Sequence, residues 1–234
     1  MKGPLRALAL VLALLAGGCA NPPAPTAAAP VVVTFGDSVP AGTACGCTPF
    51  PELYAQRIGA GSDNLAQPGF TSLDVRRQLG TRQAEAAVRT ASVVLVMAGA
   101  NDLAAAFDTG DGSYPGPASQ VERNVSAVVA DVHTLSPAAA VVIFGYWNVV
   151  EDGDVGRSDY GDDGVAEAAA ATKLCNEALR RAARGALYLD TTTALKGDSG
   201  EQDPTDLLAA DGDHPNAAGH RAIAAAAYAI LPDR

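Results

Sequence analysis

Ser38 is the residue whose neighbours best suit it to act as a nucleophile. It stands in Gly36-Asp37-Ser38, directly after the apolar run Val31–Phe35. A serine becomes nucleophilic only when a base accepts its proton, and that base needs an acid to orient it. Since Gly-Asp-Ser is also common in turns, the three histidines of the chain decide whether such a base exists.

The histidines differ in their surroundings, and only His214 has the setting of a catalytic base. His133 lies beside a stripe of valines at helical spacing and is predicted to be a surface residue. His220 flanks the apolar face of the last predicted helix and is predicted to pack there. His214 lies in a loop, three residues after Asp211, whose carboxylate can turn back and orient the imidazole. Asp213 is predicted to be solvated or bonded within the loop, because adjacent side chains diverge.

Two further segments carry donors for an oxyanion, the negative oxygen that develops during acyl transfer. The segment Asn64–Gly69 ends in a glycine whose backbone N–H can approach a substrate without a Cβ in the way. The segment Gly99-Ala100-Asn101-Asp102 offers the neutral side-chain amide of Asn101. Each segment alone is an ordinary turn, but both end predicted strands. Their donors are therefore expected on the same edge of the sheet as Ser38.

Short apolar runs predict the strands that position these residues: Val31–Phe35, a weak one near Asn64–Ala66, Val93–Ala98, Ala140–Gly145 and Ala186–Asp190. Helical patterns alternate with them: Pro51–Gly59, Ser72–Ala91 with an interruption near Gly80, Ala118–Leu135, Val165–Ala183 and Ala217–Leu231. The alternation predicts a parallel sheet covered on both faces, with functional residues at the carboxyl ends of the strands. Residues 102–117 and 146–164 are predicted to be long loops.

The N-terminus has the pattern of an export signal. Lys2 and Arg6 precede an apolar run that is too short to span a bilayer. The run leads into Leu15-Ala16-Gly17-Gly18-Cys19, which resembles a bacterial lipobox, although Ala16 stands where a leucine is usual. Two outcomes are open: lipidation of Cys19, which we favour, or an ordinary cleavage near Ala20. Both export the protein, either to the cell envelope as a lipoprotein or as a secreted protein.

The chain is accordingly divided into three parts. Residues 1–19 are predicted to be a signal peptide of the lipoprotein type, and the Pro/Ala-rich residues 20–30 a tether. Residues 31–234 are predicted to form a single catalytic domain, since 48% of the chain is hydrophobic and 18% charged, as in globular proteins. No other run is long enough for a transmembrane helix.

Three cysteines belong to the predicted domain. Cys175 lies on the apolar stripe of a predicted helix and is expected to be a buried thiol. Cys45 and Cys47 are two residues apart in a loop, a spacing that permits a strained disulfide in an exported protein. A Cys-x-Cys metal half-site is the alternative, but the sequence shows no cluster of His or Cys to complete it.

The chemical residues, taken in order, resemble one known family. The chain is similar to the SGNH-hydrolase superfamily, the GDSL lipases and esterases, over about residues 31–231, as an exported bacterial member. Four ordered blocks carry the resemblance: Gly36-Asp37-Ser38, Gly69, Gly99-Ala100-Asn101-Asp102 and Asp211-Gly212-Asp213-His214-Pro215. Val39-Pro40 departs from the residues that commonly follow the serine, but it removes no catalytic group.

The resemblance implies a fold and a set of roles. The fold would be a flavodoxin-like three-layer α/β/α sandwich with a five-stranded parallel sheet in the order 2-1-3-4-5. Ser38 would be the nucleophile, His214 the general base and acid, and Asp211 the orienting acid. The backbone N–H groups of Ser38 and Gly69, with the side chain of Asn101, would form the oxyanion hole. No metal and no cofactor is implied.

The leading hypothesis is therefore a serine esterase or lipase that cleaves carboxylic esters through an acyl-serine intermediate. The first alternative is a deacetylase or acyltransferase acting on cell-envelope glycans, which would use the same triad. The second is a non-catalytic envelope binding protein on the same fold. Several aromatic side chains could line an acyl site or belong to the core: Phe50, Phe70, Phe107, Tyr146 and Trp147.

Charge and motifs restrict the partners. The formal net charge is −10, and loss of Lys2 and Arg6 with the signal peptide makes the mature chain more acidic. Such a domain is not expected to bind nucleic acid or to dock on anionic lipid through a basic patch. The expected partner is a small-molecule, lipid or glycan ester. The protein is expected to act as a monomer, with a membrane tether if Cys19 is lipidated.

Overall fold

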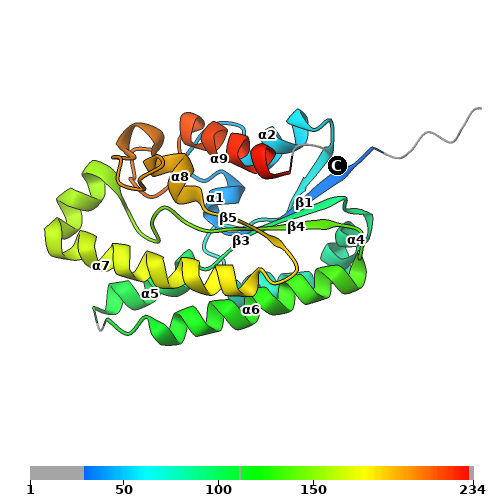
Figure 1. Ribbon diagram of the computed structural model, residues 1–234, viewed down its shortest axis with the longest axis horizontal. Helices are drawn as coiled ribbons and strands as arrows, with labels where there is room; N and C mark the ends of the chain where they lie inside the picture. Colours follow the sequence, from blue (N-terminus) through cyan, green and yellow to red (C-terminus); the bar gives the residue numbers. More distant parts are fainter. Residues whose placement is uncertain (1–28, 111, 232–234) are drawn as a thin grey trace, which may run out of the picture.

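The computed structural model describes residues 29–110 and 112–231, and its centre is a parallel sheet (Figure 1). Its five strands run in the order β2-β1-β3-β4-β5. This confirms the predicted flavodoxin-like α/β/α sandwich and its strand order. The strands are β1 (Val31–Gly36), β2 (Gly61–Asn64), β3 (Val93–Met97), β4 (Ala140–Phe144) and β5 (Leu187–Leu189).

Helices cover both faces of the sheet (Figure 1). On one face lie α2 (Phe50–Arg57), α8 (Thr191–Lys196) and α9 (Ala217–Ile230). On the other lie α3 (Ser72–Leu79), α4 (Arg82–Thr90), α5 (Ala100–Thr109), α6 (Pro115–Leu135) and α7 (Gly153–Ala182). Two short elements remain: α1 (Ser38–Ala41), which follows β1, and the 3₁₀ helix η1 (Thr205–Leu207) before α9.

The core lies where the β-branched runs of β1, β3 and β4 meet. Val33 pairs with Val94, and Val94 pairs with Val141 on the next strand. All three side chains are buried, because helices cover both faces of these central strands. In this register the last residues of β1 and β3, Gly36 and Met97, are paired. The segments that follow the two strands therefore start next to each other at one edge of the sheet.

The edge strand β2 differs from its prediction. It was expected near Asn64–Ala66 and instead comprises Gly61–Asn64, a polar and largely exposed segment. Although it has no apolar run, it is a strand because its backbone pairs with β1. An edge strand needs only one paired side, so hydrophobic patterning is a weak guide to its position.

The two predicted long loops are partly helical, so both predictions were wrong in extent. Residues 100–109 form α5, because Gly99 begins it and an alanine-rich stretch sustains it. The segment from residue 153 onward belongs to α7, whose first N–H is capped by the Asp152 carboxylate at 2.7 Å. Gly161 interrupts α7 with a non-helical conformation. Glycines in both stretches suggested loops, but here they mark a helix start and a kink.

The cysteines follow their predictions. Cys45 and Cys47 form a disulfide, and Cys175 is a buried free thiol. His220 is fully buried, as expected from its place beside the apolar face of the last helix. The fold also brings a ring nitrogen of His220 within 4.8 Å of both bridged sulfurs. That proximity could not be seen in the sequence, because the histidine lies far along the chain.

No helix among residues 29–110 and 112–231 is long and apolar enough to cross a membrane. The predicted signal peptide, and the predicted tether up to residue 28, lie outside the described residues.

Candidate active site

The turn after β1 presents Ser38 at the carboxyl end of the sheet. The Asp37 backbone N–H donates to the Met97 carbonyl of β3 at 3.1 Å, which continues the sheet by one residue beyond β1. Gly36 fits against that same carbonyl, since a Cβ at this position would lie 2.3 Å from the Met97 oxygen. Ser38 then becomes the first residue of α1, so its backbone N–H has no acceptor within that helix.

The side chain of Asp37 stabilises this turn through two hydrogen bonds. Its Oδ1 accepts the Val39 N–H at 3.1 Å, and its Oδ2 accepts the hydroxyl of Tyr146 at 2.5 Å. The side chain is almost completely buried. Burial raises the pKa of Asp37 to about 7, although both hydrogen bonds oppose the rise. Asp37 therefore caps the helix that carries Ser38 and ties it to the segment after β4.

Asp211 and His214 form a contact within the loop before α9. The Asp211 Oδ2 lies 2.8 Å from His214 Nδ1. Its Oδ1 accepts the backbone N–H groups of Asp213 and His214, each at 3.1 Å. Partial burial would raise the pKa of Asp211, but the bonds from the His214 ring and these two N–H groups hold it below its usual value.

The residues around this loop hold it in place. The Ala209 N–H donates to the His214 carbonyl at 2.7 Å, and Leu208 pairs with Pro215 as an antiparallel bridge. Asn216 caps α9 through its Oδ1, and its amide nitrogen donates to the Leu208 carbonyl at 2.9 Å. The orientation of His214 therefore depends on local backbone bonds rather than on the sheet.

Asn101 and Gly69 lie on segments that side chains tie together. The Asn101 amide nitrogen donates to the Phe70 carbonyl at 2.9 Å. Asp102 accepts the backbone N–H and the hydroxyl of Ser72, at 2.7 and 2.8 Å. Gly69 has φ +80, a left-handed conformation that glycine adopts without strain. The start of α5 thus holds the turn that contains Gly69.

Ser38 and Asn101 line one cavity of about 160 Å³. Tyr146, Trp147 and Tyr160 are aromatic members of its wall. Neither Gly69 nor His214 is part of that wall, but Asp213 is. The expectation that Asp213 is a solvated or loop-bonded residue was therefore incomplete: its backbone bonds within the loop, while its half-buried side chain faces the cavity of Ser38.

His214 lies at the edge of this arrangement. Its Nε2 has no hydrogen-bond partner among the described residues and is 3.7 Å from Asp213 Oδ2. Asp213 and Ser38 line the same cavity, so the His214 ring lies against a residue of the cavity wall. The structure thus brings His214 to Asp211 directly and to the neighbourhood of Ser38. It also leaves His214 Nε2 without a hydrogen bond to any described residue.

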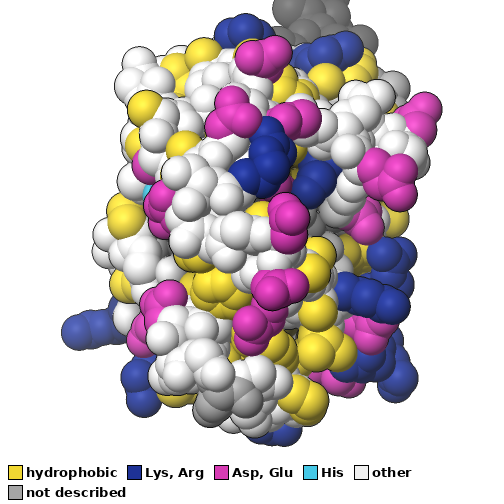
Figure 2. All heavy atoms as spheres, turned by 90° about the vertical axis from the view of Figure 1, so that its left-hand side faces the viewer, with side chains coloured by type: hydrophobic (Ala, Val, Ile, Leu, Met, Phe, Trp, Pro, Cys, Tyr) yellow, Lys and Arg dark blue, Asp and Glu magenta, His cyan; other side chains and the backbone are white. Residues whose placement is uncertain are grey.

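The cavity wall is acidic. It includes Asp108, Glu151 and Asp213, and no Lys or Arg is among its described lining residues. Burial raises the pKa of Glu151, and the negative charges of Asp213, Asp159 and Asp108 add to the effect. Figure 2 looks onto the corresponding side of the molecule and shows acidic side chains along the middle of the face, with hydrophobic surface among them. Asp108, Glu151 and Tyr160 all lie in the two long segments that the sequence singled out, 102–117 and 146–164, but no pattern marked these individual residues.

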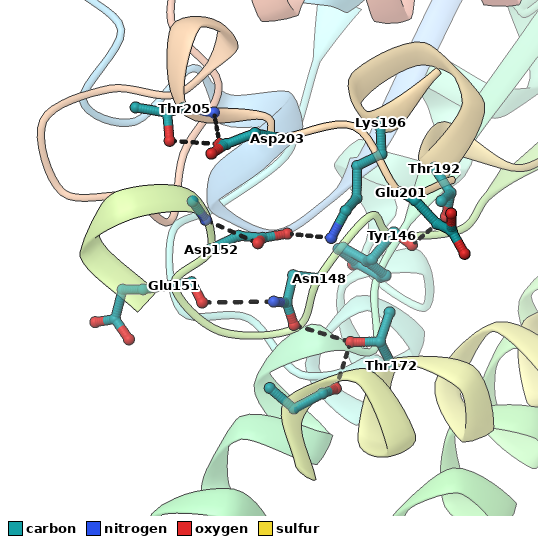
Figure 3. A network of polar contacts seen from close by, with 12 residues as sticks. Tyr146, Asn148, Glu151, Asp152, Thr172, Thr192, Lys196, Glu201, Asp203 and Thr205 are labelled. Carbon is teal, nitrogen blue, oxygen red and sulfur yellow. Dashed lines mark hydrogen bonds and ion pairs between the residues drawn. The ribbon is translucent and has the colours of Figure 1, made fainter. Parts of the chain in front are cut away.

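The segment after β4 forms another part of the wall and is anchored by polar contacts (Figure 3). Asn148 accepts the Thr172 hydroxyl of α7 at 3.0 Å. Asp152, the cap of α7, pairs with Lys196 of α8 at 2.9 Å. The close-up shows these contacts reaching from α7 on one side of the segment to α8 on the other. Tyr146 and Trp147 are therefore presented to the cavity by backbone that is fixed on both sides.

A family model for the GDSL-like lipases and acylhydrolases matches residues 34–222, the stretch that holds every one of these side chains. The chain belongs to this family. It is accordingly an enzyme of the lipase and esterase class, which acts on ester bonds. A search of curated proteins finds no significant match.

Solved structures share the fold at low sequence identity. The lipase Lip_vut3 from a goat rumen metagenome has a TM-score of 0.68 at 16% identity, covering 88% of this chain and 99% of its own. The acetylxylan esterase Axe2 from Geobacillus stearothermophilus, as a catalytic mutant, has a TM-score of 0.63 at 16% identity, with coverage of 88% and 95%. An extracellular lipase from Streptomyces rimosus has a TM-score of 0.62 at 18% identity, with coverage of 86% and 99%.

Proposed function

We propose that this GDSL-family enzyme hydrolyses carboxylic esters through an acyl-Ser38 intermediate, with His214 as base and Asp211 as the orienting acid. The observation that carries the proposal is the 2.8 Å contact between Asp211 Oδ2 and His214 Nδ1. A carboxylate at this distance favours the tautomer with its proton on Nδ1, so that Nε2 can accept a proton. Nε2 is the ring nitrogen without a partner among the described residues.

The first half of the reaction acylates the serine. As Ser38 Oγ attacks the ester carbonyl, its proton passes to His214 Nε2, and the imidazolium that forms is stabilised by the Asp211 carboxylate. The imidazolium then gives this proton to the leaving alcohol as the tetrahedral intermediate collapses. The low pKa of Asp211 keeps the carboxylate ionised throughout the pH range in which His214 works as a base.

Three donors are proposed for the oxyanion: the Ser38 N–H, the Gly69 N–H and the Asn101 amide. The Asn101 nitrogen carries two protons, of which one is engaged by the Phe70 carbonyl at 2.9 Å. This bond fixes the amide plane and leaves the other proton for the substrate. A donor held in place before reaction stabilises developing charge without a cost of reorganisation.

Deacylation uses the same groups in reverse order. His214 Nε2 removes a proton from an incoming hydroxyl, which attacks the acyl-Ser38 carbonyl, and Ser38 Oγ recovers its proton from the imidazolium. With water as acceptor the product is a carboxylic acid. With a sugar hydroxyl as acceptor the same steps transfer the acyl group, so we propose hydrolysis on the simpler assumption of water.

The size of the cavity favours esters with a short acyl group as substrates. Its volume of about 160 Å³ is below the roughly 300–1,000 Å³ of sites that enclose drug-sized ligands. Its acidic wall also disfavours esters that carry a negative charge near the scissile bond. Acetate and butyrate esters of neutral alcohols fit both features, and sugar acetates belong to the same class.

The proposal is tested with p-nitrophenyl esters of increasing chain length and with a fluorophosphonate probe. We expect the wild type to be labelled once, at Ser38, and to cleave the acetate and butyrate faster than the palmitate. Ser38→Ala should lose both labelling and turnover, while Ser72→Ala, a serine bound to Asp102, should keep labelling. A wild type that neither reacts with the probe nor differs from Ser38→Ala would refute the proposal.

Export and lipidation of Cys19 are proposed on the sequence pattern alone, since residues 1–28 lie outside the described structure. Mass spectrometry of the native N-terminus tests them. A diacylglyceryl group on Cys19 is the expected result, whereas an unmodified N-terminus near Ala20 would indicate secretion without an anchor.

A further inference from the structure

The Cys45–Cys47 disulfide lies in the loop between α1 and α2, close to the turn that carries Ser38. Its two cysteines are separated by one residue, with Cα atoms 5.1 Å apart. The loop-closure entropy that a disulfide removes from the unfolded chain grows with the number of residues enclosed, so this bridge contributes little to stability in that way. A role as a structural staple therefore does not account for it.

The backbone directly before the bridge has an unfavourable conformation at Ala44. Ala44 has φ +58 and is the one residue other than glycine with positive φ among the described residues. An alanine in this region brings its Cβ close to the following carbonyl oxygen, which glycine avoids. Both cysteines are half-buried, and Gly46 between them is exposed, so the bridge can be reached from solvent.

His220 of α9 lies beside the bridge, and its ring carries a donor without an acceptor among the described residues. Its Nδ1 accepts the backbone N–H of Phe50 at 3.2 Å, which places the ring proton on Nε2. Nε2 has no hydrogen-bond partner among the described residues, although His220 is fully buried. A ring nitrogen of His220 lies within 4.8 Å of both Sγ atoms. A buried N–H without an acceptor is unfavourable, and a thiolate nearby would supply one.

The two sulfurs are not equivalent. The Cys47 backbone N–H donates to Cys45 Sγ at 3.0 Å. A negative charge on Cys45 Sγ would thus have this donor in place and His220 as a second one after a small movement. Hydrogen bonds to a charged group are stronger than those to a neutral one, so Cys45 is the better leaving thiolate.

We propose that the Cys45–Cys47 bridge is a site of thiol–disulfide exchange with an external dithiol, which attacks Cys47. One thiolate of the dithiol bonds to Cys47 Sγ, the Cys45–Cys47 bond breaks, and its electron pair leaves on Cys45 Sγ. The second thiol of the dithiol then displaces Cys47 and closes an external disulfide. The dithiol is oxidised by two electrons, the bridge is reduced by two, and the two thiol protons pass to Cys45 and Cys47.

Reduction of this bridge reaches the Ser38 turn through the backbone. The Thr43 N–H donates to the Ser38 carbonyl at 3.0 Å, and Cys45 follows two residues later. The helix α1 has four residues, and this bond holds its end together with those that the Gly42 N–H donates to the Ser38 and Val39 carbonyls. Opening the bridge is expected to loosen residues 42–49. A fall in esterase activity would follow, and that consequence alone rests on the proposed function.

The test uses the folded mature protein, treated with glutathione and then with dithiothreitol, and quenched in acid. Fragmentation of the Cys45–Cys47 peptide locates the glutathione, which we expect on Cys47. With dithiothreitol and an alkylating agent, we expect two labels in this peptide, none on the buried Cys175, and an unchanged circular dichroism spectrum. Faster hydrogen exchange over residues 42–49 is expected in the reduced form. These readouts need no ester, so they hold even if the esterase proposal fails.

A matched pair of variants tests the part played by His220. His220→Leu removes the donor and should slow bridge reduction by about tenfold, the usual worth of one hydrogen bond to a charge. His133→Leu changes a half-buried histidine elsewhere and should leave the rate unchanged. Glutathione on Cys45, or a bridge that is reduced only when the protein unfolds, would overturn the proposal. The wild-type readouts decide the matter if His220→Leu does not fold.

Discussion

Asp37 contacts the helix that carries Ser38 and Asp211 contacts His214, and the surroundings of these two aspartates shift their pKa values in opposite directions. Asp37 is almost completely buried at the end of β1, and burial raises its pKa to about 7. Asp211 is exposed in a surface loop, and hydrogen bonds from His214 and two backbone N–H groups hold its pKa below the usual value. The Asp37 carboxyl is buried between α1 and Tyr146, whereas the Asp211 carboxylate accepts hydrogen bonds from residues of its own loop.

This difference predicts a structural role for Asp37 and a catalytic role for Asp211. Asp37 contacts the backbone of α1 and the Tyr146 hydroxyl, so its removal should be felt mainly in stability. Asp211 contacts the imidazole and backbone of its own loop, so its removal should be felt mainly in turnover. Substitutions of Asp211 and Asp37 test this division directly, and substitutions of Asn101 and Glu151 test the residues around them. The four are taken from the largest expected effect to the smallest.

Asp211→Asn should lower kcat by about 10³–10⁴, because an amide donates to His214 Nδ1 and stabilises the wrong tautomer. The Asn oxygen can still accept the two backbone N–H groups, so the melting temperature should change little. Asp213→Asn is the matched control from the same loop and should keep most of kcat. Steady-state kinetics on a short-chain ester decides, and a loss in both variants alike would mean that the loop's charge, rather than Asp211, matters.

Asn101→Ala should lower kcat by about 10²–10³, the usual effect of removing one oxyanion donor. The Phe70 carbonyl also loses its donor, so thermal unfolding should accompany the kinetics. An unchanged kcat would remove Asn101 from the reaction and leave it as a residue that only positions the Gly69 turn.

Asp37→Asn should change stability in a pH-dependent way. A carboxyl whose pKa is about 7 in the folded chain and 3.8 otherwise favours folding most below about pH 4, and this contribution is lost as the pH rises to 7. From about pH 5 to about pH 8, the stability of Asp37→Asn relative to wild type should therefore rise by ~3 kcal/mol. Urea unfolding at both pH values measures this. A constant difference would show that burial does not raise the Asp37 pKa.

Glu151→Gln should have the smallest effect and should concern selectivity. Removing one charge from the acidic wall should raise kcat/KM for an anionic ester, such as a hemisuccinate, by about threefold at low salt. The same variant should treat a neutral acetate ester as wild type does. Equal changes for both esters would mean that Glu151 acts on the shape of the cavity and not through its charge.

Much of this arrangement could be predicted from the sequence, for reasons that differ between elements. The strands β1, β3 and β4 carry continuous β-branched runs because both of their faces are buried, and those runs are visible as such. The contact between Asp211 and His214 was predictable because it is local, three residues apart in one loop.

What could not be predicted depends on the packing of distant segments. The bond of Tyr146 to Asp37 joins two residues that follow different strands, β4 and β1, and nothing near either residue in the sequence indicates it. The strand β2 exists through its pairing with β1 and lacks an apolar pattern. Asp213 was predicted to be solvated or bonded within its loop, and the loop sequence alone gives no indication of the cavity that its side chain lines.

The proposed nucleophile and base are far apart in the sequence, at positions 38 and 214. The helix that follows the base, α9, packs against α2. Phe50 and His220 join these two helices through a hydrogen bond. During synthesis the chain therefore acquires Ser38 well before the groups that would activate it. A chain without α9 would carry an inert hydroxyl, so ester cleavage would begin only after this helix has been made and has docked on α2.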